Sequence, residues 1–203
     1  IAVARILKAY IYSTITDSWG DVPYSQALSG NSNPVFDKQS DIYTGMLSEL
    51  AAAVNQLSTT GGAIAGDVIY AGNVTKWKKL ANSLRMRLAL QLSKKYPAAG
   101  QFSAVQFNAA LNHVDGFITD NADNFKVSFP GGSFKSPWFN LYNGRSDYGE
   151  SETMTALMSS LSDGRQAAFG TSSLGVPYGR LRTYIDPWTS NNPTWARILN
   201  ASY

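Results

Sequence analysis

The stretch from residue 137 to residue 149 combines large aromatic rings with planar polar side chains. A sugar ring presents flat patches of C–H bonds flanked by hydroxyl groups, so a saccharide site needs an exposed ring with Arg, Asn or Asp side chains beside it. This composition predicts a ligand-binding site, to which we expect Trp138, Tyr142 and Arg145 to contribute most. The alternative is that these rings only attach a long loop to the rest of the protein. The full candidate set is Trp138, Tyr142, Asn143, Arg145 and Asp147.

A second aromatic cluster lies in the sequence YIDPWTSNNPTW, residues 184–195. Its tryptophans, Trp188 and Trp195, stand among Pro, Ser and Asn residues that favour exposed turns. Both are therefore candidates for ligand binding. The alternative is that neighbouring segments of a longer chain cover them, and the residue pattern does not decide between the two.

The supply of nucleophiles and metal ligands is small. Cysteine is absent, which removes disulfides, thiolate metal sites and a cysteine nucleophile. The single histidine, His113, lies in the helix-like string NAALNHV, where we expect it to make a local hydrogen bond at a helix end. We therefore predict no catalytic residue, no metal site and no cofactor.

Two groups of acidic residues suggest more specific chemistry. Asp147, Glu150 and Glu152 invite comparison with a glycosidase acid and nucleophile, but the two glutamates stand where a helix is expected to begin, and negative charge is favourable there for electrostatic reasons alone. The three aspartates between residues 115 and 123 lack the alternating carboxylates and the final Glu of an EF-hand loop. Neither group changes the prediction of a binding protein.

Charge and hydropathy exclude two further classes. Lysine and arginine total 17 against 14 acidic residues, a net charge of +3 that is too small and too scattered to indicate a nucleic-acid surface. No apolar run reaches the length needed to cross a bilayer. Residue 1 already lies inside a helical pattern with no charged leader before it, so we expect the natural start of the protein to be missing.

Apolar residues recur at helical spacing over much of the chain and must position the candidate residues. The spacing predicts a mainly α protein in which Trp77 packs in the core, Ser40 and Ser151 cap helices, and Phe125, Val127 and Phe129 alternate as in a short strand. Residues 115–149 and 167–203 are expected to be loops. The predicted helices cover about 6–19, 40–57, 75–92, 103–114 and 151–161.

The string SWGDVPYSQAL forms a corner after the first predicted helix. Gly20 can adopt the backbone conformation that closes a helix, and Pro23 cannot continue one. Trp19 and Tyr24 are expected to pack against helix ends and fix this corner, so their role is structural.

Longer strings resemble a known family. TDSWGDVPYSQAL, FDKQSDIYTGMLSEL, GDVIYAGNVTKWKKLANSLRMRLALQLS, ITDNADNFKVSF, LSDGRQAAF and GVPYG follow in the order typical of the SusD/RagB family, described as starch-binding associating with outer membrane. The resemblance extends from about Ile6 to Tyr178. Its most specific part is the block from Gly72 to Leu92.

The resemblance implies a glycan-binding lipoprotein on the surface of Bacteroidetes-type bacteria. Such a protein covers a SusC-like TonB-dependent transporter and passes oligosaccharides to it without cleaving them. The implied fold is a helical body with tetratricopeptide-like helix pairs and a ligand site on loops. We expect one domain over residues 1–203, a fragment lacking both ends, the lipid anchor among the missing parts. Its helical body would cover about 1–114 and 150–163, and its ligand-binding region about 115–149 and 167–203.

Two other functions stay open on the sequence. One is a helical scaffold that mainly binds the transporter protein. The other, with less support from the residues, is a surface glycoside hydrolase. Neither the sugar nor the linkage follows from the residues, because an aromatic platform accepts many rings.

Overall fold

The computed structural model describes residues 1–58, 60–61, 64–143 and 147–198, with backbone only for residues 140–142. It separates into two compact units, Ile1–Ser128 and Phe129–Tyr203. Helices are the main regular elements of both units among the described residues, as expected of a mainly α protein. The assignment of the chain to a single domain stays a prediction, because compact units of this kind can belong to one domain.

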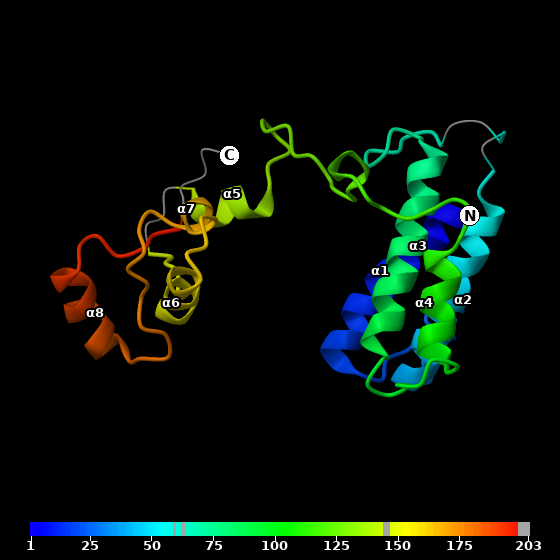
Figure 1. The fold of residues 1–203 in the computed structure, drawn as a ribbon, viewed down its shortest axis with the longest axis horizontal. Coiled ribbons are helices and arrows are strands. Elements are labelled where there is room, and N and C mark those ends of the chain that lie inside the picture. The colour runs from blue at the N-terminus through cyan, green and yellow to red at the C-terminus, as the bar shows by residue number, and fades with distance from the viewer. Residues whose placement is uncertain (59, 62–63, 144–146, 199–203) are drawn as a thin grey trace. The chain divides into compact units, whose positions relative to one another are not determined.

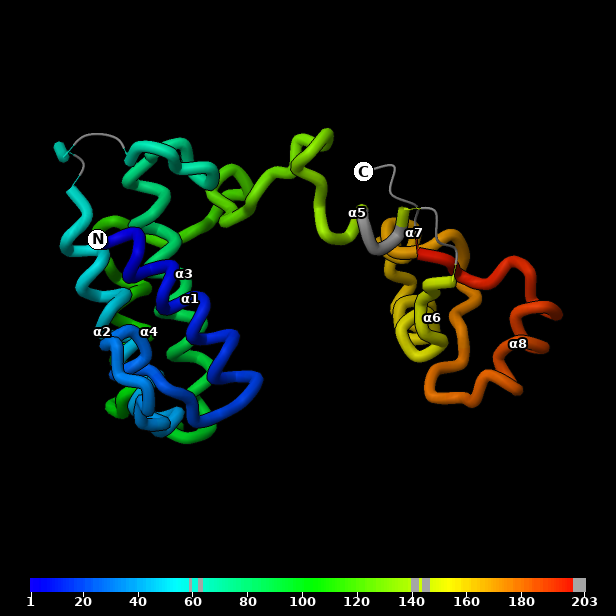
Figure 2. Tube along the Cα trace, turned by 180° about the vertical axis from the view of Figure 1, so that it is seen from behind, coloured from blue at the N-terminus to red at the C-terminus, as the bar shows by residue number. Residues whose placement is uncertain are grey.

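Four helices build the first unit: α1 (Ala2–Trp19), α2 (Gln39–Gln56), α3 (Val74–Gln91) and α4 (Phe102–Leu111). Each packs against the next, and they run alternately in opposite directions (Figures 1 and 2). A short 3₁₀ turn, η1 (Asn121–Asp123), packs on α3. The helical body is confirmed, and a tetratricopeptide-like form of its helix pairs stays a prediction.

The core of the first unit follows the apolar spacing of the sequence. Along α2, residues Ile42, Met46 and Leu50 recur every four positions and are fully buried. Trp77 on α3 is 1% exposed, which confirms its predicted place in the core. None of the helices in the described part of the chain is long and apolar enough to cross a membrane.

One carboxylate organises the turn before α3. Asp67 accepts hydrogen bonds from the indole Nε1–H of Trp77 at 2.7 Å and from three backbone N–H groups at 2.9–3.1 Å, those of Ile69, Tyr70 and Gly72. Burial pushes the pKa of Asp67 upward, but these hydrogen bonds outweigh it and hold the pKa below its usual value. The string GDVIYAGN therefore forms a structural turn that attaches to the core through Trp77.

Tyr24 helps to hold the corner after α1. Its ring packs edge-on against Tyr12 and lies so close to Gly45 on α2 that a Cβ there would be 2.6 Å from it. Gly20 ends α1 with a positive φ of 74°, as expected. The expectation for Trp19 is wrong, because its side chain is 73% exposed.

The second unit contains α5 (Pro137–Tyr142), α6 (Glu152–Ser160), α7 (Gln166–Phe169) and α8 (Arg182–Asn191). Helix α6 begins at the predicted cap, since Ser151 Oγ accepts from Met154 N–H. Three of the helices, α5, α7 and α8, lie where loops were expected. Helix α5 starts with a Ser136 cap and Pro137 in the first turn, and α8 continues through an internal Pro187, so residues that usually mark turns stand within helices here.

Two other local predictions are wrong. Helix α2 is preceded by Lys38 and has no side-chain cap, so Ser40 does not cap it. The alternating Phe125, Val127 and Phe129 form no strand. Phe125 instead packs edge-on against Tyr10 in the first unit.

Backbone hydrogen bonds join three separate segments of the second unit. Glu150 N–H donates to Ala196 O at 2.9 Å, and its carbonyl accepts from Val176 N–H at 2.7 Å. Ala196 N–H in turn donates to Leu174 O at 2.7 Å. The segments around residues 150, 175 and 196 are thus fixed side by side, although only isolated β-bridges form between them.

Candidate functional site

A pocket of about 710 Å³ opens in the second unit, over these three joined segments and one side of α8. The segments contribute the residues around Glu150, Val176 and Trp195, and the helix contributes Ile185, Asp186, Thr189 and Ser190. The pocket is built from parts of the chain that are far apart in the sequence. The backbone hydrogen bonds described above hold these parts side by side.

Trp195 lies at the base of the pocket and is only 8% exposed. It packs directly on Gly149, where an added Cβ would be 2.6 Å from the indole ring and 2.9 Å from Val176. Real Cβ atoms essentially never approach so closely, so this position requires glycine. The glycine therefore allows the indole to approach the backbone at residue 149 closely.

Aromatic rings and cations meet at the pocket rim. Tyr178 is 88% exposed. The guanidinium of Arg197 lies over the Trp195 ring at 4.8 Å, and that of Arg180 lies over the Tyr184 ring at 5.4 Å. Such cation–π contacts hold long side chains in one orientation. The pocket therefore offers a ring face together with planar hydrogen-bond donors.

Two carboxylates of the pocket have contrasting surroundings. Asp186 on α8 is exposed and forms an ion pair with Arg182 at 3.1 Å. Glu150 is 5% exposed, and neither of its carboxylate oxygens has a hydrogen-bond partner among the described atoms. Burial raises the pKa of Glu150, since it disfavours the charged form. Its carboxyl lies against Gly170, where a Cβ would be 2.8 Å from the Glu150 Cδ atom.

Comparison with known families decides the identity of this fold. The family model described as "Starch-binding associating with outer membrane", SusD-like, matches residues 1–182. The chain belongs to this SusD-like family. A comparison with curated proteins found no match.

Solved structures agree with the assignment. A chitin-binding protein is 31% identical over 84% of this chain and 36% of its own, with a TM-score of 0.73. A chitin-binding SusD homologue from Flavobacterium johnsoniae is 26% identical over 97% of this chain and 42% of its own, with a TM-score of 0.82. A SusD homologue from Bacteroides uniformis is 26% identical over 100% of this chain and 43% of its own, also at 0.82. The SusD-like chain thus spans well under half the length of these relatives.

The structure brings two of the predicted site residues to the pocket. Asp147 and Trp195 both line it. Trp188 is half-buried on α8 and is not part of the lining, although its neighbours on that helix are. Trp195 is buried apart from its pocket-facing part, so it is no open platform. Its role, like that of the other candidates, stays a prediction.

The remaining candidates lie elsewhere in the second unit or outside the description. Trp138 is 65% exposed on α5, and Asn143 follows the end of that helix; neither lines the pocket. Arg145 and the side chain of Tyr142 lie outside the described residues.

Sequence reasoning missed Tyr178, Arg180 and Arg197 as pocket residues. The first two belong to or follow the string GVPYG, in which Gly179 has a positive φ of 76° and turns the chain at the rim. An aromatic residue between a proline and a glycine, followed by an arginine, was the available signal. Arg197 has no such signal in the sequence, because only its contact with Trp195 in the structure identifies it as a pocket residue.

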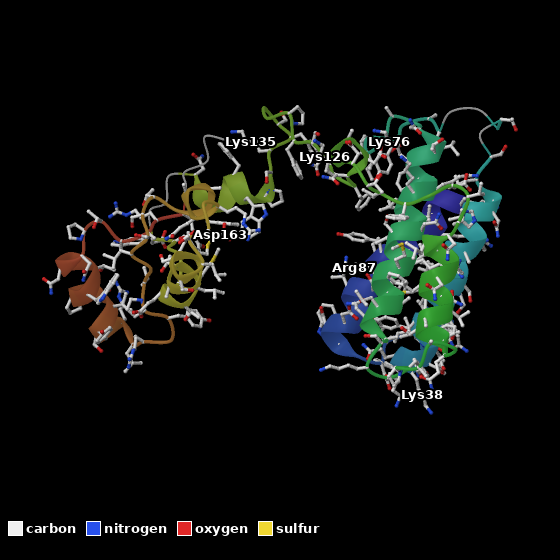
Figure 3. All side chains as sticks on the ribbon, in the orientation of Figure 1. Lys38, Lys76, Arg87, Lys126, Lys135 and Asp163 are labelled. Carbon is white, nitrogen blue, oxygen red and sulfur yellow. The ribbon has the colours of Figure 1, made fainter. Side chains whose placement is uncertain are left out.

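The other titratable groups considered above have structural partners. Lys78 pairs with Asp115 at 3.1 Å, and Asp123 pairs with Lys79 at 2.6 Å and with Lys76, labelled in Figure 3, at 3.4 Å. His113 makes the expected local contact, accepting from Asp115 N–H at 3.2 Å. No cluster of His, Cys, Asp and Glu in the described ranges is arranged to hold a metal ion.

Proposed function

We propose that this SusD-like chain binds an oligosaccharide in the pocket of its second unit and does not cleave it. The supporting observation is the combination of an exposed ring, Tyr178, with guanidinium donors from Arg180 and Arg197 in one concave site. Rings match the apolar faces of sugars, and planar donors match their hydroxyl groups. Asp147 and the edge of Trp195 complete the contact surface.

The relatives support the same ligand class. Two similar solved proteins are named as chitin-binding, and the family description refers to starch binding and to association with the outer membrane. We extend glycan binding to this chain on the strength of its pocket. The proposed setting is a surface lipoprotein of the outer membrane that passes its ligand to a SusC-like TonB-dependent transporter.

Trp138 is a proposed second contact for a longer glycan. It is 65% exposed on α5, whose first turn is fixed by the Ser136 cap at 3.2 Å. A ring held on a helix forms a firmer platform than a ring on an irregular loop. Tyr142, Asn143 and Arg145 would act beside it, and Trp188 beside the pocket.

Isothermal titration of the 203-residue chain with a panel of oligosaccharides tests the proposal. We expect binding by at least one glycan, and a loss of about fivefold to tenfold in Tyr178→Ala, if the contact of a sugar with one aromatic ring contributes ~1–1.4 kcal/mol, as a ring pair does. Trp138→Ala should weaken only the longer oligosaccharides.

Phe36→Ala is the matched control, because Phe36 is 71% exposed in the first unit and does not line the pocket. Circular dichroism verifies that each variant is folded. Absence of binding across the panel would contradict the proposal. Release of shorter products from any glycan would instead support the hydrolase alternative.

A further inference from the structure

We infer that the ligand of this pocket is an acidic saccharide, one that carries a carboxylate or sulfate group. The inference rests on the proposed function and specifies its substrate class. Its basis is the pair of arginines, Arg180 and Arg197, that line the pocket and have no acidic partner among the described residues. A guanidinium keeps its charge at every physiological pH and presents paired donors that match a carboxylate or sulfate.

The carboxylates that line the same pocket do not neutralise these arginines. Asp186 is paired with Arg182 at 3.1 Å, and Asp147 also has an interaction partner. Glu150 is buried at 5% exposure with its carboxyl against Gly170, which does not line the pocket. The guanidinium groups of Arg180 and Arg197 therefore stay available to a ligand.

Both guanidinium groups are already oriented by aromatic rings. Arg197 lies over Trp195 at 4.8 Å, and Trp195 is itself fixed by contact with Gly149. Arg180 lies over Tyr184 at 5.4 Å. Orienting long side chains before binding lowers the entropy cost of contacting an anion.

The placement of Tyr178 agrees with this ligand class. Its ring is 88% exposed and lies two residues before Arg180, on the rim of the same pocket. A sugar that packs on this ring would bring its substituents close to a guanidinium. A neutral sugar would use the ring and accept hydrogen bonds from a guanidinium through its hydroxyl groups, whereas a uronate or a sulfated sugar would accept stronger, charge-assisted ones.

Titration calorimetry on the 203-residue chain with matched pairs of probes tests the inference. One pair is an oligogalacturonate and its carboxyl-reduced, neutral counterpart. The other is a chondroitin sulfate oligosaccharide and its desulfated form, which keeps its glucuronate carboxylates, so that this pair tests the sulfate alone. We expect the more highly charged member of at least one pair to bind tenfold or more tightly, with an affinity that falls as sodium chloride is raised.

Arg180→Gln and Arg197→Gln should each weaken the acidic probe by about tenfold to a hundredfold, since a charge-assisted hydrogen bond contributes on that scale. The affinity for a neutral probe should fall less, by about twofold to fivefold, since only a hydrogen bond without opposite charge is lost. Arg165→Gln is the matched control: Arg165 is exposed in the same unit, is paired with Asp163 at 2.5 Å and does not line the pocket.

The outcomes separate this inference from the proposed function. Equal or tighter binding of the less charged member in both pairs would overturn the acidic ligand and leave glycan binding intact. Failure of every probe and of the wider panel to bind would overturn the proposed function as well. The salt dependence of the unmodified chain gives a readout that does not depend on the folding of any variant.

Discussion

The first and the second unit of this protein are each stabilised internally by different interactions. In the first unit, buried apolar side chains form one continuous core that contacts all four long helices. In the second unit, the buried apolar residues among those described are Met158, Trp195 and Ala196, and separate segments are joined by backbone hydrogen bonds instead. The comparison indicates that a periodic core builds the body of the protein, whereas the ligand pocket depends on a few close backbone contacts.

Among the substitutions considered, Trp77→Ala should cause the largest loss of stability. This loss should be confined to the first unit. Trp77 is 1% exposed, packs edge-on against Tyr70 at 5.2 Å and donates to Asp67. We expect Trp77→Ala to lower the free energy of unfolding by about 4 kcal/mol in urea titrations, because it leaves a large cavity. Trp19→Ala is the control at 73% exposure and should cost less than about 0.5 kcal/mol. Equal losses would contradict the apolar-core account.

Asp67→Ala should cause the next largest loss, lowering the free energy of unfolding by about 2–3 kcal/mol. It removes an acceptor of four hydrogen bonds and leaves the Trp77 indole N–H unpaired in the core. Because the folded pKa of Asp67 lies below its usual value, its contribution is present above about pH 4 and is lost as the pH falls through the folded pKa. Acid unfolding curves of the two proteins should therefore converge at low pH. Curves that stay parallel would show that this carboxylate is not the cause.

Gly149→Ala should lower the free energy of unfolding of the second unit by about 2 kcal/mol and distort its pocket. The added Cβ would lie 2.6 Å from the Trp195 ring, so the indole must move away from the base of the pocket. Glycan affinity and the near-ultraviolet circular dichroism of tryptophan should both change, while the helical signal of the first unit stays. Gly164→Ala is the matched control, since a Cβ added at Gly164 would meet no atom within 4 Å. Unchanged glycan binding in Gly149→Ala would remove the pocket from the proposed function.

Glu150→Gln should change stability least, and it should stabilise the protein where the other substitutions destabilise it. Burial raises the pKa of Glu150, so the favourable neutral form contributes fully below about pH 4.5, and this stability is lost as the pH rises through the folded pKa. Near neutral pH the amide should stabilise the second unit by ~1 kcal/mol, because an uncharged side chain replaces a buried charge. Thermal unfolding at several pH values measures this change. A variant less stable than the parent at pH 7 would contradict it.

Sequence patterns predicted the first unit well because its elements depend on local periodicity. The α3 interval and the buried Trp77 follow from the recurrence of apolar residues every three or four positions. The helix boundaries were less accurate. Side-chain capping fails at Ser40, since α2 begins at Gln39 without any side-chain cap.

The pocket was only partly predictable. Asp147 and Trp195 were selected by residue type, but Tyr178, Arg180 and Arg197 reach them through backbone pairing between distant segments. No periodic pattern encodes such isolated bridges. Helix α8 was missed for a related reason: Pro187 and the asparagines near its end resemble a loop locally, and only the structure shows that they continue a helix.

The order of the pocket segments along the chain has a consequence for synthesis. Residues 1–128, with their own core, leave the ribosome first and can fold while the second unit is still being made. The base of the pocket comes last, since Trp195 and Ala196 must meet segments around residues 150 and 175 that were made well before them. A nascent chain halted before residue 194 would therefore already contain the residues of the helical body, yet it would lack Trp195 and Arg197 of the proposed glycan pocket.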